Sequence, residues 1–129
     1  MAKHVIIYSA NELIRVQPEV IAYAASEGNY TTLVLIDNSK QIYAFNLSHF
    51  EALLRSQLGD DDTMFIRTGK RLIINKEYIY KLNISKQLLV LADIRCNCSF
   101  SLTASKAALR QLKNYLESQL PHSPSSKGK

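Results

Sequence analysis

The most informative stretch of the chain reads Phe65-Ile-Arg-Thr-Gly-Lys-Arg-Leu-Ile-Ile-Asn75. It sets an apolar, β-prone run behind three cations, Arg67, Lys70 and Arg71. Gly69 can turn the backbone between them, since glycine tolerates conformations that other residues avoid. The pattern predicts a rigid pair of strands that holds a short basic loop out towards a polyanion. Phosphate-rich nucleic acid is therefore the first class of partner to consider.

The composition is that of one small globular domain with a modest positive charge. The chain has 129 residues, of which 47% are hydrophobic, and this is enough for a single domain with its own core. The formal charge of +5 favours an anionic partner, although many ordinary proteins are this basic. No apolar run approaches the ~20 residues that cross a bilayer. The N-terminal apolar run is too short for a signal-peptide core, so a cytoplasmic location is expected.

Short β-prone runs dominate the chain and predict a mainly β fold. The clearest run, residues 30–36, is almost wholly β-branched, aromatic or leucine. Turns of a few residues, rich in Gly, Asn, Asp and Ser, join the early runs, and this favours an antiparallel meander. The other expected strands are 4–9, 12–16, 20–26, 41–45, 64–67, 72–74, 78–84, 87–92 and 95–102.

Two helices interrupt the strands. Ser48-His-Phe-Glu51 matches a capping box and predicts a helix that ends at Gly59. The second helix is expected to begin near Thr103 or Ser105, either of which can cap it, and to end at Pro121. Four leucines, at 109, 112, 116 and 120, form its apolar stripe. The three aspartates at 60–62 are expected to form a solvated loop.

The sequence contains no recognisable catalytic or metal-binding motif. The three histidines fall in unrelated parts of the chain, and none is spaced to pair with a nucleophile. Cys96 and Cys98 are expected to lie half-buried on one face of a strand as free thiols, and no further ligand lies near them in sequence. We therefore expect a protein that is not an enzyme and has no catalytic residues, no metal site and no cofactor.

A second segment carries a family resemblance. Val20-Ile-Ala-Tyr-Ala-Ala-Ser-Glu-Gly-Asn-Tyr-Thr31 resembles the opening signature of the LytTR family of bacterial DNA-binding domains. In that family a helix follows, and then a block in which Phe and Arg precede a basic tripeptide, apolar residues and Asn; the stretch from Phe65 to Asn75 is similar to that block. A strand start at Tyr78-Ile79 and a helix start at Ser105-Lys106 complete the order. The resemblance covers roughly residues 12–120.

The resemblance implies an elongated, mainly β fold of short antiparallel sheets, with a short central helix and a C-terminal helix. It also implies that loops, and not a recognition helix, enter the major groove of DNA. Carried over onto this chain, the DNA-binding residues are Asn29, Tyr30, Thr31, Arg67, Lys70, Arg71, Lys106 and Arg110. Arginine or lysine can donate to guanine and asparagine can pair with adenine, whereas Thr31, Arg67 and Arg110 suit phosphate contacts better.

Two positions depart from the family pattern. Gly69 stands where the family usually has His, and Lys106 stands where it usually has Arg. Because lysine offers a point charge and not a bidentate fork, base preference is expected to differ from that of the family. The family often joins this domain to a receiver domain, and this chain is expected to stand alone. The expected division is an extension strand at 1–11, the DNA-binding domain at 12–120 and a flexible tail at 121–129.

The sequence thus predicts a sequence-specific, DNA-binding transcriptional regulator. Its expected partners are double-stranded DNA and a second copy of the chain on repeated half-sites, with no membrane and no small-molecule substrate. The first strand is expected to pad the sheet edge, the other option being pairing with a second subunit. The alternative function is a protein-interaction module of the same fold that uses its basic face for an acidic partner. Salt response and sequence dependence distinguish the two functions.

Overall fold

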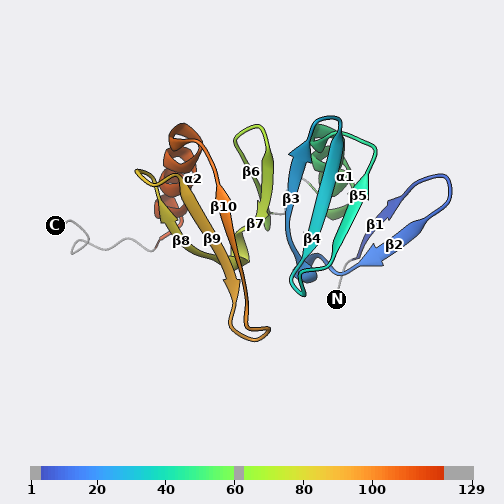
Figure 1. Cartoon of the computed structure of the whole chain (residues 1–129), viewed down its shortest axis with the longest axis horizontal. Helices are drawn as coiled ribbons and strands as arrows, with labels where there is room; N and C mark the ends of the chain where they lie inside the picture. The colour runs from blue at the N-terminus through green and yellow to red at the C-terminus, as the bar shows by residue number, and fades with distance from the viewer. Residues whose placement is uncertain (1–3, 60–62, 121–129) are drawn as a thin grey trace.

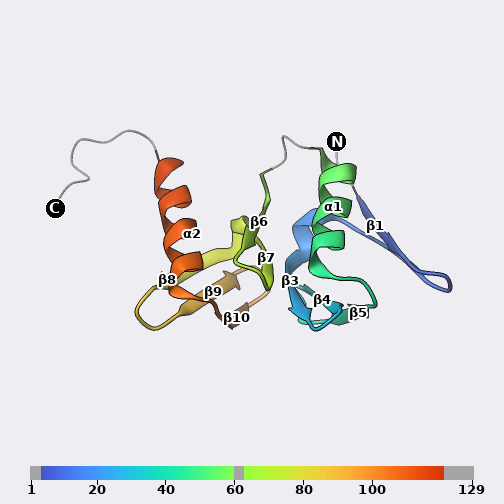
Figure 2. The same cartoon turned by 90° about the horizontal axis from the view of Figure 1, so that it is seen from above.

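The computed structural model describes residues 4–59 and 63–120. Over these ranges the chain forms three antiparallel sheets and two α-helices in an elongated arrangement, with both helices on the same side of the sheets (Figures 1 and 2). The mainly β fold class is confirmed. Neither helix in the described part of the chain is long and apolar enough to cross a membrane. The expected aspartate loop at 60–62 and the expected tail at 121–129 lie outside the described residues.

The largest sheet has five strands in the order β5-β4-β3-β7-β6. Its first three strands form the predicted meander, and β7 then pairs with the other edge of β3 in the register Ala25 opposite Leu72. This pairing puts the β3–β4 turn and the β6–β7 loop at the same end of the sheet (Figure 1). The strands are β3 (Ile21–Glu27), β4 (Tyr30–Leu35), β5 (Lys40–Tyr43), β6 (Phe65–Thr68) and β7 (Leu72–Asn75).

Helix α1 (Leu47–Leu58) covers one face of this sheet and buries Phe50, Leu54 and Leu58. Its N-cap is Asn46, whose side chain accepts a hydrogen bond from the His49 backbone N–H at 2.8 Å. The capping box predicted on Ser48 is therefore wrong. The helix begins at Leu47, before Ser48. The Glu51 side chain is therefore not used in a cap, and it accepts a hydrogen bond from Arg67 instead. The C-terminal stop at Gly59 is confirmed.

The first two strands, β1 (Val5–Tyr8) and β2 (Leu13–Val16), pair with each other as a separate two-stranded sheet. The prediction that the first strand pads the main sheet edge is therefore wrong. Val5 and Ile7 are buried in the same core as α1, and the Gln57 side-chain amide bonds both the N–H and the carbonyl of Ile6, at 2.8 and 2.9 Å. Packing against the helix thus decides where this hairpin lies.

The third sheet has the order β10-β9-β8, and α2 packs on it through a second core. Leu109 and Leu112 are buried there, Leu116 is partly buried and Leu120 is 65% exposed, so the predicted leucine stripe is one residue too long. Cys96 lies exposed in the turn before β10 and not on the strand, and both thiols are free. The elements are β8 (Ile79–Asn83), β9 (Leu88–Asp93), β10 (Cys98–Thr103) and α2 (Lys106–Ser118), and short 3-10 turns at Pro18–Val20 and Lys76–Tyr78 precede β3 and β8.

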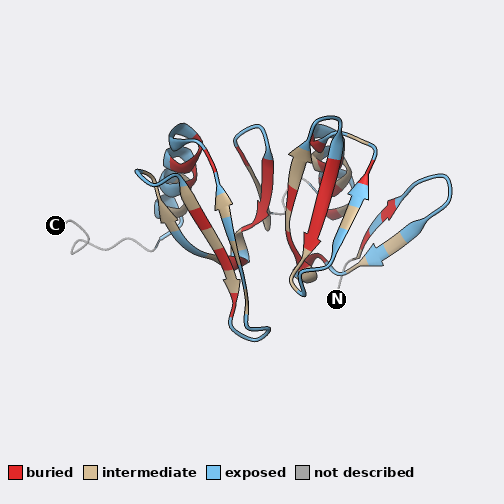
Figure 3. Ribbon diagram, in the orientation of Figure 1, coloured by how far each residue is buried: buried red, intermediate tan, exposed pale blue. Residues whose placement is uncertain are grey.

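The two cores lie on either side of the β6–β7 hairpin. Figure 3 shows buried residues on the central strands and on the helix faces turned towards them, while the turns at the upper end are exposed. Alternate residues of β7 serve the two cores, because successive side chains of a strand point to opposite faces. Ile73 belongs to the core beneath α1, and Ile74 belongs to the core beneath α2. The hairpin therefore joins the two halves of the molecule.

Candidate nucleic-acid interface

The β6–β7 loop consists of three residues, Gly69, Lys70 and Arg71, between the paired Thr68 and Leu72. Gly69 has a φ of +72°, the left-handed conformation that the sequence predicts for a turning glycine. The side chains of Lys70 and Arg71 are exposed. The backbone of the loop is held at its far end, where the Arg71 carbonyl accepts a hydrogen bond from the Ser26 N–H at 2.9 Å. The basic loop is therefore attached to β3.

The β3–β4 turn lies beside this loop. Glu27 pairs with Tyr30, so Gly28 and Asn29 form a two-residue turn, with a positive φ of 63° at Gly28. Asn29 is exposed, and Tyr30 is 52% exposed. Both residues are thus accessible to a partner, which a contact with DNA requires.

Thr31 is not available in this way. It is fully buried, and its hydroxyl donates a hydrogen bond to the Phe45 carbonyl at 2.8 Å. Its side chain points to the opposite face of β4 from that of Tyr30, because side chains alternate along a strand. The assignment of Thr31 to DNA contact is therefore wrong, and its role is to tie β4 to the segment that precedes α1.

The N-terminus of α2 approaches the basic loop from the other side. Ser105 is the N-cap, with its hydroxyl oxygen accepting from the Ala108 N–H at 3.1 Å. A Cβ atom at Gly69 would lie 3.2 Å from the Ala108 Cβ, so the loop rests on the first turn of the helix. Lys106 and Arg110 are exposed on this part of α2. The structure thus brings the basic block and the predicted helix start together.

A cavity of about 550 Å³ lies between the loop and the helix. Its walls are the β6–β7 loop, the end of β10 and the first turn of α2, with small side chains such as Ala104, Ala107 and Ala108 among them. Lys70 and Arg71 stand at this cavity, and neither forms an ion pair within the described ranges. The surface is therefore concave and carries uncompensated positive charge, which suits a polyanion.

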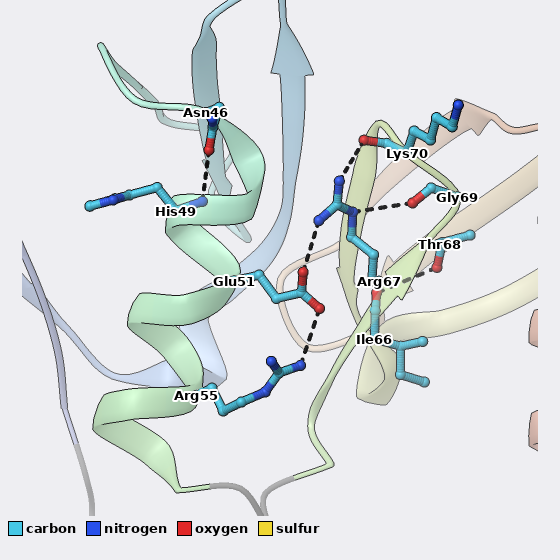
Figure 4. A network of polar contacts seen from close by, with 9 residues as sticks. All are labelled: Asn46, His49, Glu51, Arg55, Ile66, Arg67, Thr68, Gly69 and Lys70. Carbon is cyan, nitrogen blue, oxygen red and sulfur yellow. Dashed lines mark hydrogen bonds and ion pairs between the residues drawn. The ribbon is translucent and has the colours of Figure 1, made fainter.

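Arg67 differs from the other predicted cations. Its Nε and Nη2 donate to the carbonyls of Gly69 and Lys70, at 3.1 and 2.9 Å, and its Nη1 donates to Glu51 Oε1 at 2.8 Å (Figure 4). Its side chain is only 26% exposed. The guanidinium is therefore engaged inside the protein.

Two residues of the site region escaped sequence reasoning. Glu51, on α1, accepts a hydrogen bond from Arg67, which lies 16 residues later in the chain. The sequence instead suggested that Glu51 belongs to a capping box with Ser48. Asn75, the last residue of the basic block, is fully buried; it donates to the Ile21 carbonyl at 2.9 Å and accepts from the Glu77 N–H at 3.0 Å. In the sequence, Asn75 directly follows an apolar, β-prone run. An asparagine at such a position is a signal for a bridge of this kind, since a buried amide needs hydrogen-bond partners.

Comparison with known proteins agrees with this arrangement. The family model of the LytTr DNA-binding domain matches residues 11–117. A solved structure is similar, the LytTr DNA-binding domain of a protein from Bacillus cereus described as a methyl-accepting/DNA response regulator. It is 16% identical, with a TM-score of 0.62, and the match covers 88% of this chain and 96% of that one, which shows a shared fold. No curated protein matches. Because the family model spans most of the chain, the chain belongs to the LytTR family of DNA-binding domains.

Proposed function

We propose that this protein is a sequence-specific transcriptional regulator that inserts loops into the major groove of DNA. The observation that carries the proposal is that three segments far apart in sequence meet along one edge of the molecule, beside the β6–β7 hairpin that joins its two cores. They are the β3–β4 turn, the β6–β7 loop and the start of α2. The Ser26–Arg71 hydrogen bond joins the first two, and the approach of Gly69 to Ala108 joins the last two.

The exposed residues of these segments suit different roles on DNA. Arg71 and Lys70 have the donors that guanine accepts in the major groove, and Asn29 has the donor and acceptor that adenine needs. Lys106 is the first residue of α2 and Arg110 lies one turn further along it. Both suit phosphate contacts, which set register without reading sequence. Tyr30 presents an exposed ring beside Asn29.

Selection of bound duplexes from a random pool at low salt tests the proposal. A single motif should emerge, and two repeats within it would indicate that two copies bind repeated half-sites. The affinity for that motif should fall as a steep power of salt concentration, because each phosphate contact releases counterions. A pool that yields no motif would refute the proposal. Salt-sensitive binding of an acidic protein in that case would favour the protein-interaction module.

Single substitutions separate base contacts from phosphate contacts. Arg71→Ala is expected to relax preference at one base position, by ~1–3 kcal/mol, if the guanidinium reads a base edge. Arg110→Ala should instead weaken binding about equally on all sequences and reduce the salt slope by about 0.9. Affinities for the selected site and its single-base variants measure both effects. A uniform loss in Arg71→Ala would assign that residue to the phosphate backbone.

A further inference from the structure

We propose that Arg67 is a positioning residue, which fixes the basic β6–β7 loop to α1 through Glu51 and does not itself contact phosphate. This inference rests on the proposed DNA-binding function. It replaces the phosphate contact that the sequence suggested for Arg67, and it gives Glu51, an acidic residue, a part in nucleic-acid recognition.

The hydrogen bonds of the loop carbonyls support this assignment. Gly69, Lys70 and Arg71 each have one backbone carbonyl, and all three accept a hydrogen bond from the body of the protein. Arg67 supplies the first two bonds, and the Ser26 N–H supplies the third. With its carbonyls held inward, the loop keeps its cationic side chains outward. Figure 4 shows the Lys70 side chain directed away from the Arg67 guanidinium.

Electrostatics point the same way. The charge of Arg67 is balanced by Glu51 at 2.8 Å, so it adds little to the positive field outside the protein. Glu51 also pairs with Arg55, one turn further along α1, at 3.3 Å through its other carboxylate oxygen, and this second contact involves no atom of the loop. Lys70 and Arg71 form no ion pair with any described residue, so their charges remain available to DNA.

Only arginine can make this set of contacts. Its planar guanidinium presents donors in a fixed fork, and here three of its nitrogens reach two carbonyls and one carboxylate at once. Lysine keeps the charge but has a single nitrogen, so it cannot hold both carbonyls in the same geometry. Holding the loop before DNA arrives lowers the ordering cost of binding. The replacement of arginine by lysine therefore separates charge from positioning.

The experiment compares Arg67→Lys and Glu51→Gln with Arg55→Ala as the matched control. Arg55 contacts the same carboxylate from a more exposed position, and no loop atom is among its hydrogen-bond partners. The first measurement uses protein without DNA, and follows NMR relaxation and hydrogen exchange of the amides at 69–71. Both test variants should increase the mobility and exchange of these amides, and Arg55→Ala should leave them unchanged. Thermal unfolding establishes that each variant is folded. If Arg67→Lys does not fold, the result for Glu51→Gln alone tests the positioning role.

The second measurement uses the selected DNA site and a random duplex. Both test variants should lose about tenfold in affinity for the selected site, the size of one misaligned base contact, while binding to random duplex and the salt slope stay as in the wild type. A phosphate contact predicts the opposite: Arg67→Lys would bind almost normally, and Glu51→Gln, which removes a negative charge, would bind more tightly. Unchanged loop amides together with wild-type preference would overturn the positioning role. If the wild type itself selects no motif, the proposed function fails, and the amide measurements still decide whether Arg67 orders the loop.

Discussion

Gly69 occupies a position in the candidate interface where an added side chain would be crowded against α2. Its φ of +72° lies in the left-handed region, and Ala108 on α2 closes the space that a side chain would fill. The family resemblance of the sequence implies a histidine at this position, where this chain has glycine. The close contact of loop and helix at this point depends on the missing Cβ.

Substitution of Gly69 tests that contact. Gly69→Ala should lower the free energy of unfolding by about 1–2 kcal/mol through backbone strain, and by more through the 3.2 Å approach to Ala108. Gly28→Ala is the matched control, because its φ is +63° but nothing lies within 4 Å of the new Cβ. Denaturant unfolding of the two variants gives the difference. Equal losses would show that the loop does not rest on α2.

Tyr43 is a residue whose titration affects stability. Burial, and secondly the Glu12 carboxylate, raise the pKa of Tyr43 from 10.0 to about 12. Between these values the folded state holds a proton that the unfolded chain has lost. The stability that the protonated Tyr43 hydroxyl contributes is therefore fully present below about pH 10, and it is lost as the pH rises towards about 12.

Tyr43→Phe should therefore make the alkaline loss of stability shallower. Some loss should remain, because burial also raises the pKa of Tyr23 and of Tyr78. At neutral pH the variant should be as stable as the wild type or more so, since the buried Tyr43 hydroxyl has no hydrogen-bond partner among the described residues. Unfolding free energies from pH 7 to 11 check this, with the exposed Tyr80→Phe as control. An unchanged alkaline limb in Tyr43→Phe would contradict the assignment.

At the scale of elements, α1 is placed by its first turn. Asn46 caps the helix, and the helix then carries Glu51 to a position facing β6. The capping box on Ser48 was a reasonable prediction from four residues, but it would have turned the Glu51 side chain back towards the helix start. The observed cap leaves that carboxylate to Arg67 and Arg55.

The cap can be checked by substitution. Asn46→Ala should lower the free energy of unfolding by about 1 kcal/mol, because the His49 N–H loses its acceptor. Ser48→Ala should change stability by less than ~0.5 kcal/mol, as is usual for an exposed position outside a cap. Denaturant unfolding of both variants distinguishes the two sites. A larger loss for Ser48→Ala would restore the capping box.

At the scale of the whole molecule, the candidate interface lies where the two cores meet. The β6–β7 hairpin contacts α1 through Glu51 and α2 through Ala108, and β7 supplies buried side chains to both cores. The candidate interface keeps its geometry only if the two cores remain packed on the β6–β7 hairpin. We therefore expect the two cores to unfold as one unit.

Substitutions on β7 test this cooperativity. Ile73→Ala and Ile74→Ala should each lower the free energy of unfolding by ~2–5 kcal/mol, the usual effect of truncating a fully buried isoleucine. Each should also increase hydrogen exchange in α1 and α2 together, although the two side chains face different cores. Ile42→Ala, at a position 66% exposed, is the control. Faster exchange in α2 alone after Ile74→Ala would show two independent units.

The sequence by itself determined the local features of this protein. Strand runs, short turns, the glycine in the basic loop and the cap of α2 depend on residues close together in the chain, and most were predictable within a residue or two. The exceptions are the start of β10, which lies three residues after the predicted position, and the cap of α2, which the sequence left between Thr103 and Ser105. The order of the motifs also identified the family. The exposed positions Asn29, Lys70 and Arg71 followed from that order.

Only the tertiary structure decided which of these residues face outward and which segments meet. Thr31 turned inward because β4 packs beneath the segment before α1, and Arg67 turned inward because α1 brings Glu51 to it. The pairing of β7 with β3, which sets the two loops side by side, joins residues more than 40 positions apart. Such contacts depend on packing between distant segments, and local patterns carry no information about them.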